Sequence, residues 1–141
     1  MLIFLVPVDG SEHSNRTIEH VIRQLEWYKG PVAIHLLNVQ PRMSGGVGAF
    51  VSHDAIAKFQ QEEGMKELQG AMRQLDAAGV KYQHHIGVGE PAETIVGYAR
   101  EQRCDLIVMG ARGMGAVSSL VLGSVATKVI HLATFPVLLV K

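Results

Sequence analysis

The chain has 141 residues, 48% hydrophobic and 18% charged, a composition that fits one globular α/β domain covering residues 1–141. Basic and acidic side chains number 13 each, so no net positive field attracts nucleic acid or an anionic membrane. No apolar run reaches the roughly 20 residues that span a bilayer, and the N-terminus lacks the cationic region of a signal peptide. The single cysteine, Cys104, excludes an internal disulfide. We therefore expect a cytoplasmic protein that binds neither nucleic acid nor membrane.

Strand and helix patterns alternate along the chain. Residues 2–8 form a continuous apolar run rich in branched side chains, typical of a strand buried on both faces of a parallel sheet. Asp9-Gly10 ends this run, and Ser14 is predicted to cap a first helix that continues to about residue 25. Further strands are expected at 32–39, 81–88, 106–109 and 136–140, further helices at 54–78, 91–103 and 124–132, and a glycine-rich loop at 41–52.

This alternation predicts an α/β fold, an open twisted parallel sheet of five strands with helices on both faces and right-handed crossovers. In such Rossmann-like sheets, ligands bind outside the carboxyl ends of the strands, where the strand order reverses. Three segments follow strands at that edge: 9–11, 39–40 and the glycine-rich stretch 110–124. If the first and fourth strands are neighbours, these segments line one crevice.

The stretch after the fourth strand has the composition of a phosphate-binding loop. Gly110, Gly113 and Gly123 permit positive φ and let backbone N–H groups approach an anion closely. Ser124 is expected to cap the following helix, whose positive dipole end would point at the ligand. A tight turn is the alternative role for the first two glycines. The leading candidate ligand is a nucleotide.

Common nucleotide motifs do not fit this stretch. A P-loop requires a lysine directly after its last glycine, whereas Ser124 stands there and Lys128 lies a turn later. A dinucleotide fingerprint should follow the first strand, where the sequence is Asp-Gly-Ser-Glu-His-Ser, and residues 113–118 match it only weakly. The Ser-Gly-Gly triplet at 44–46 lacks the continuation of a pyrophosphate-binding loop. What remains is the spacing Gly110-x2-Gly113-x9-Gly123-Ser124.

With that spacing, the chain resembles the universal stress protein family, in the subclass whose members bind ATP. Residues 6–11 match the family's opening, 110–124 its nucleotide loop and 135–140 its closing strand. The resemblance covers essentially the whole chain. It implies an adenine nucleotide alpha hydrolase-like sheet of order 3-2-1-4-5, ATP with Mg²⁺ in the crevice, and a homodimer joined through the last strand.

The resemblance also implies roles for individual residues. The region of Gly110, Gly113, Gly123 and Ser124 would hold the phosphates, Asp9 would contact the ribose or a phosphate-bound cation, and the backbone around Val39 would meet the adenine. The complete set expected at the nucleotide site is Pro7, Val8, Asp9, Val39, Met109, Gly110, Arg112, Gly113, Gly123, Ser124 and Val125.

Asp9 and Arg112 are the charged residues expected to matter most at the nucleotide site. A carboxylate at the end of a buried strand is costly unless a donor or cation meets it. For Asp9 a ribose hydroxyl pair or a metal would serve, and the alternative is a cap for the turn at 11–14. The stretch 114–122 has no basic residue, where many ATP-binding relatives carry one. Arg112 is then the local cation, and the preference among ATP, ADP and AMP stays open.

Other chemically suggestive residues have structural interpretations. His84 and His85 would point to opposite faces of a strand, which disfavours a shared metal. Met65 and Met72 are predicted core residues, and Cys104 a half-buried small hydrophobe rather than a nucleophile.

Three functions are considered. The first is an ATP-binding stress-response or signalling dimer with at most slow ATP hydrolysis. The alternatives are an adenine-nucleotide-using enzyme of the same fold and a dimeric interaction module with an unoccupied pocket. No Ser-His-Asp order or carboxylate pair supplies a catalytic base, which disfavours the enzyme. The intact glycine spacing disfavours the empty module.

Overall fold

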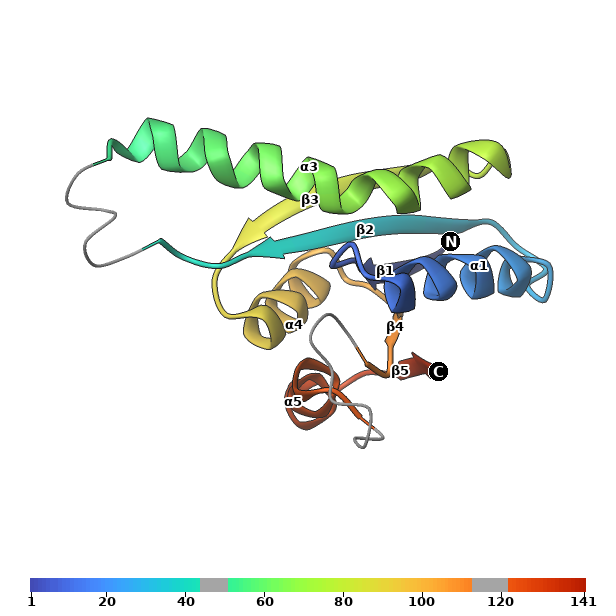
Figure 1. The fold of residues 1–141 in the computed structure, drawn as a ribbon. Coiled ribbons are helices and arrows are strands. Elements are labelled where there is room, and N and C mark those ends of the chain that lie inside the picture. Colours follow the sequence, from blue (N-terminus) through green and yellow to red (C-terminus); the bar gives the residue numbers. More distant parts are fainter. Residues whose placement is uncertain (44–50, 113–121) are drawn as a thin grey trace.

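The computed structural model describes residues 1–43, 51–112 and 122–141 of the chain. Within them, five parallel strands form one sheet in the order β3-β2-β1-β4-β5 (Figure 1). The predicted fold class and strand order are therefore confirmed. In chain order the elements are β1 (Leu2–Pro7), α1 (Glu12–Leu25), β2 (Val32–Gln40), α3 (His53–Ala77), β3 (Tyr82–Val88), α4 (Pro91–Glu101), β4 (Leu106–Gly110), α5 (Ser124–Leu132) and β5 (Val137–Val140).

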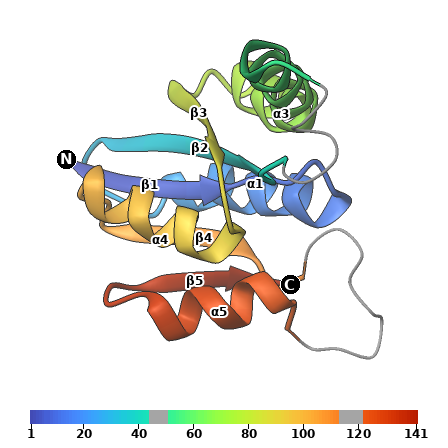
Figure 2. The same ribbon diagram turned by 90° about the vertical axis from the view of Figure 1, so that its left-hand side faces the viewer.

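Helices cover both faces of the sheet (Figures 1 and 2). They enclose two apolar cores, one on each face. Alternate side chains of one strand enter different cores, because successive residues of a strand point to opposite faces. Phe4 and Val6 of β1 pack with α1 and α3, whereas Leu5 between them packs with α4 and α5. This double burial explains why the strand is apolar without interruption.

Helix α3 is the longest element, with 25 residues, and it packs over β2 and β3. Its contact with the sheet is close: a Cβ at Gly64 would lie 2.8 Å from the Ile86 side chain. Met65 and Met72 are partly buried against the same core, as predicted. Despite the length of α3, no helix of the described part of the chain is apolar enough over a sufficient span to cross a membrane.

The start of α1 differs from the prediction. Ser11, and not Ser14, is the N-cap, and its Oγ accepts a hydrogen bond from the Ser14 N–H at 3.2 Å. Gly10 adopts φ +82°, which turns the chain sharply and lets the helix begin at Glu12. Ser14 lies inside the first turn of α1, where its hydroxyl donates a hydrogen bond to the Asp9 carboxylate instead.

Candidate functional site

The ends of β1, β2 and β4 meet at one edge of the sheet. The Val8 N–H donates to the Leu37 carbonyl at 2.9 Å, which extends the pairing of β1 with β2 past the end of β1. At β4, the Ala111 carbonyl accepts a 2.6 Å hydrogen bond from the N–H of Gly123. The start of α5 is thereby held against the end of β4, beside the segment that follows β1.

A cavity of about 140 Å³ opens at this edge. Its wall is almost entirely apolar, and Asp9 is its one charged lining residue among those the structure describes. The side chains come from the ends of three strands and from the first turns of α4 and α5. The lining consists of Pro7, Val8, Asp9, Leu37, Val39, Pro91, Ile95, Met109 and Val125.

The cavity brings together six residues that the sequence predicts at a nucleotide site: Pro7, Val8, Asp9, Val39, Met109 and Val125. Leu37, Pro91 and Ile95 line it as well, and the sequence interpretation missed them. Leu37 stands two residues before Val39, so the period-two alternation of a strand could have found it. Pro91 and Ile95 lie one helical turn apart at the start of α4, and only the packing of α4 onto the sheet reveals their position.

The carboxylate of Asp9 organises the turn after β1. Its Oδ1 accepts hydrogen bonds from the Ser11 N–H at 2.9 Å, the Ser11 hydroxyl at 2.5 Å and the Ser14 hydroxyl at 2.9 Å. The Asp9 N–H in turn donates to Ser14 Oγ at 3.0 Å. The turn-capping role weighed as an alternative is therefore present, and it fixes a half-buried carboxylate at the cavity wall.

The predicted glycine conformations need correction. Gly110 is the last residue of β4, and Gly123 has φ −72°, so neither adopts the expected positive φ. Close packing instead favours glycine at position 110, because a Cβ there would lie 3.0 Å from the Arg112 carbonyl oxygen, which would have to move by a few tenths of an ångström. Gly123 is the N-cap of α5 without a side-chain hydrogen bond, and Ser124, predicted as the cap, is the exposed first residue of the helix. Gly113 lies outside the described residues.

Basic side chains near this edge have different surroundings. Arg112 is half-buried two residues after the end of β4. Lys128 of α5 forms ion pairs with Glu90 at 3.4 Å and Glu93 at 3.8 Å, which tie α5 to the first turn of α4. The hydrogen bond from the Glu93 N–H, with further support from Lys128, lowers the pKa of Glu90 below its ordinary value. The carboxylate of Glu90 is thus committed to capping α4.

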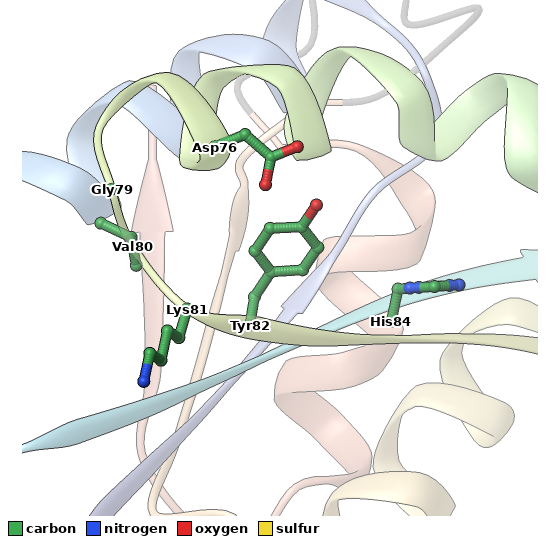
Figure 3. A pocket seen from close by; sticks show the side chains of 6 residues that line it. All are labelled: Asp76, Gly79, Val80, Lys81, Tyr82 and His84. Carbon is green, nitrogen blue, oxygen red and sulfur yellow. The ribbon is translucent and has the colours of Figure 1, made fainter.

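A larger depression of about 610 Å³ lies at the opposite, amino-terminal end of β3. Figure 3 shows Asp76 of α3 above Tyr82, with Lys81 and His84, which also line the depression, on either side of Tyr82. Burial, followed by the hydrogen bond with the Asp76 carboxylate, raises the pKa of Tyr82. The depression is wide open to solvent and lies away from the edge where parallel α/β sheets bind ligands. The smaller cavity at the carboxyl ends is therefore the better candidate site.

A partly buried cluster of two histidines and a tyrosine lies under α4. The ring of His35 stacks on that of His85, with centroids 5.5 Å apart, and His85 in turn lies 4.8 Å from the ring of Tyr98. Within the described residues, His35 Nδ1, His85 Nε2 and the Tyr98 hydroxyl have no hydrogen-bond partner. Burial lowers the pKa of both histidines, and for His85 the charges of His35 and His84 add to the effect.

The two adjacent histidines lie on opposite faces of β3, as predicted: His84 lines the depression beside α3, whereas His85 lies against α4. Cys104 is 8% exposed in the α4 core, and burial, with a smaller effect of Asp105, raises its pKa to about 11. This agrees with the predicted role of Cys104 as a packed hydrophobe. Among the described residues, no three His, Cys, Asp or Glu side chains are grouped as metal ligands.

Comparison with known proteins identifies the family that shares this architecture. The chain matches the Universal stress protein family over residues 1–141. It is 36% identical over 138 residues to universal stress protein MJ0531 of Methanocaldococcus jannaschii, covering 97% of this chain and 80% of the relative. It is 31% identical over 143 residues to universal stress protein YxiE of Bacillus subtilis, covering 97% of each.

Solved structures of universal stress proteins have the same fold. The structure of MJ0577 from Methanocaldococcus jannaschii superposes with a TM-score of 0.81 at 29% identity, covering 99% of this chain and 94% of that one. A universal stress protein of Archaeoglobus fulgidus, solved in complex with dAMP, superposes with a TM-score of 0.67 at 25% identity, covering 100% and 98% of the two chains. The sequence and the architecture together show that this chain belongs to the universal stress protein family.

Proposed function

We propose that the chain binds an adenine nucleotide in the cavity at the carboxyl ends of β1, β2 and β4. The apolar cavity with Asp9 in its wall carries this proposal. Whole-ligand pockets are typically about 300–1,000 Å³, so a cavity of about 140 Å³ encloses the planar base while the sugar and phosphates lie outside it. The dAMP complex of the Archaeoglobus fulgidus relative supports a nucleotide of this class.

The finer proposal is that the nucleotide is ATP with Mg²⁺ and that binding regulates a stress-response or signalling dimer. The first turn of α5, with Gly123 held on Ala111, directs helix N–H groups toward the edge where phosphates would lie. Arg112 supplies a nearby positive charge, and Mg²⁺ would arrive with the phosphates, on the side of the cavity where Asp9 lies. An enzyme of the same fold remains the second candidate, separated from the first by a turnover assay.

Isothermal titration of the purified protein with AMP, ADP and ATP, each with and without Mg²⁺, tests the proposal. We expect saturable binding of adenine nucleotides and none of GTP at the same concentration. Binding that is strongest for ATP with Mg²⁺ supports the finer proposal, whereas equal binding of AMP restricts it to the nucleoside monophosphate part. No heat or saturation with any adenine nucleotide rejects the proposed function.

Replacement of Asp9 should separate its two roles. Asp9→Ala should weaken ATP binding by about 1–3 kcal/mol, the range for losing a hydrogen bond to a charged group. Asp9→Asn keeps an oxygen for Ser11 and Ser14 but removes the charge, so it should preserve the melting temperature better than Asp9→Ala while losing any Mg²⁺ dependence. Titration and thermal unfolding of both variants are the measurements. Unchanged affinity in both variants would remove Asp9 from the site.

We also propose that two copies pair through β5, the edge strand of the sheet. The carbonyl of Pro136 accepts a hydrogen bond from Ile107 of β4 at 3.1 Å, and that of Val140 accepts one from Ala111, directly after β4, at 2.8 Å. Because backbone groups alternate in direction along a strand, those of Val137 and Leu139 point away from β4. An apolar edge of this kind is an aggregation hazard unless it is covered, and an antiparallel copy related by a two-fold axis would cover it.

Leu139→Pro should therefore convert the dimer to a monomer. Proline removes the outward N–H of residue 139 without touching the bonds to β4. Leu139→Ala is the matched control, because it loses the same side chain but keeps the N–H. Sedimentation velocity at micromolar concentration should give a dimer for the original chain and the alanine variant, and a monomer for the proline variant. A monomeric original chain would refute this assembly.

A further inference from the structure

A buried polar network joins α3 to the turn that follows β1. Asn38 and Gln40, at the end of β2, are 1% and 6% exposed. Asn38 Nδ2 donates to the Val8 carbonyl at 2.9 Å and to Glu67 Oε2 at 2.5 Å. Gln40 Nε2 donates to Asn38 Oδ1 at 2.8 Å and to the same Glu67 oxygen at 3.1 Å. Oε2 of Glu67 on α3 thus accepts hydrogen bonds from both side-chain amides.

The network fixes the orientation of Asn38. The Val8 carbonyl and the Glu67 carboxylate can only accept hydrogen bonds, so both must face the NH₂ group and not the oxygen of this side chain. The two amide hydrogens of Asn38 are used by Val8 and Glu67, and its Oδ1 accepts a hydrogen bond from Gln40. A satisfied buried network of this kind specifies one arrangement, whereas loss of its charged acceptor leaves buried donors unpaired.

Glu67 also packs directly on the turn. A Cβ at Gly10 would lie 3.2 Å from the Cα, Cβ and Cγ atoms of Glu67. Gly10 has φ +82° and follows Asp9, the charged residue of the cavity wall. The segment from Val8 to Gly10 is therefore held from two sides, by Asn38 at the Val8 carbonyl and by the stem of Glu67 over Gly10.

We propose that Glu67 is a positioning residue for the nucleotide site: it holds Asn38 and the turn from Val8 to Gly10 in the geometry that presents Asp9 to the ligand. Glu67 is absent from the lining of the cavity, so its effect on binding passes through these neighbours. The inference rests on the proposed nucleotide function. If it holds, a residue of α3, which is remote in sequence from the cavity wall, helps to determine the affinity for the nucleotide.

Three variants test the role of Glu67. Glu67→Ala removes the acceptor from a half-exposed helix position, where alanine favours the helix. Glu67→Gln keeps one oxygen, which suffices because a single oxygen accepts both bonds. Glu63→Ala is the matched control, since Glu63 lies about one turn earlier on α3 and pairs only with Lys66 among the interactions described, at 3.0 Å.

Each variant is measured in two ways: by titration with AMP, and by the backbone amide resonances of Asp9, Gly10 and Ser11 in the ligand-free protein. We expect Glu67→Ala to bind roughly tenfold more weakly and to shift these three amides. Glu67→Gln should restore both readouts, and Glu63→Ala should change neither. General destabilisation does not predict rescue by glutamine, and melting temperatures identify a temperature at which all variants are folded.

The failure of this inference is distinct from failure of the proposed function. If the original chain binds no adenine nucleotide, the proposed function fails and the amide resonances alone decide the role of Glu67 in holding the turn. Unshifted amides in Glu67→Ala, wild-type affinity in that variant, or a glutamine variant as impaired as the alanine variant would each overturn the positioning role.

Discussion

Val125→Trp should abolish adenine-nucleotide binding while leaving the fold intact. Val125 is a half-buried residue in the first turn of α5 and lines the cavity of about 140 Å³. An indole at this position would extend into the space proposed for the base, and the existing opening would accept it without the strain of overpacking a closed core. We expect a loss of at least about a hundredfold, equivalent to roughly 2.7 kcal/mol of binding free energy.

Titration with AMP and ATP measures this loss, with circular dichroism as the check on folding. Ile130→Trp is the matched control because Ile130 lies on the same helix, is 45% exposed and is absent from the cavity wall. Retained affinity in the control and lost affinity in the variant would locate the base in the cavity. If Val125→Trp binds nucleotide normally, the ligand lies elsewhere.

The free energy of unfolding should fall as the pH drops below about 6.5, the ordinary pKa of histidine. Burial lowers the pKa of His35 and His85 in the folded chain, so the unfolded chain binds more protons in this window. The stabilisation is therefore complete above the unfolded pKa and is lost as the pH falls through that value toward the folded pKa. Each extra proton contributes a slope of at most about 1.4 kcal/mol per pH unit.

Urea denaturation between pH 7.5 and 5 measures this dependence. His35→Phe keeps a ring to stack on His85 but cannot be protonated, so its stability should vary less with pH than that of the original chain. His53→Gln is the control, because this exposed histidine lies at the start of α3, outside the cluster. Parallel pH profiles for the original chain and His35→Phe would show that His35 does not cause acid lability.

Much of the fold could be predicted because the signals are local. The apolar run of β1 indicates burial on both faces, and Gly30-Pro31 marks the break before β2. Alternating strands and helices then leave few topologies. The residues at the ends of strands were found for the same reason, since the carboxyl ends of parallel strands share one edge.

What the sequence could not supply depends on packing between distant segments. Pro91 and Ile95 enter the cavity because of how α4 lies on the sheet. His35 becomes chemically interesting only when β3 places His85 beside it. The preference for glycine at position 110 likewise comes from the nearby carbonyl of Arg112, and not from the backbone angle that the residue type suggests.

The inertness of Cys104 limits how this protein can sense oxidative conditions. The chain's only cysteine is buried, and a thiol with a pKa of about 11 carries very little of the nucleophilic thiolate at neutral pH. Peroxide and disulfide reagents react with thiolates, so they reach this sulfur only after the region between α4 and β4 opens. Oxidation of Cys104 is therefore a poor route for a signal to the folded chain.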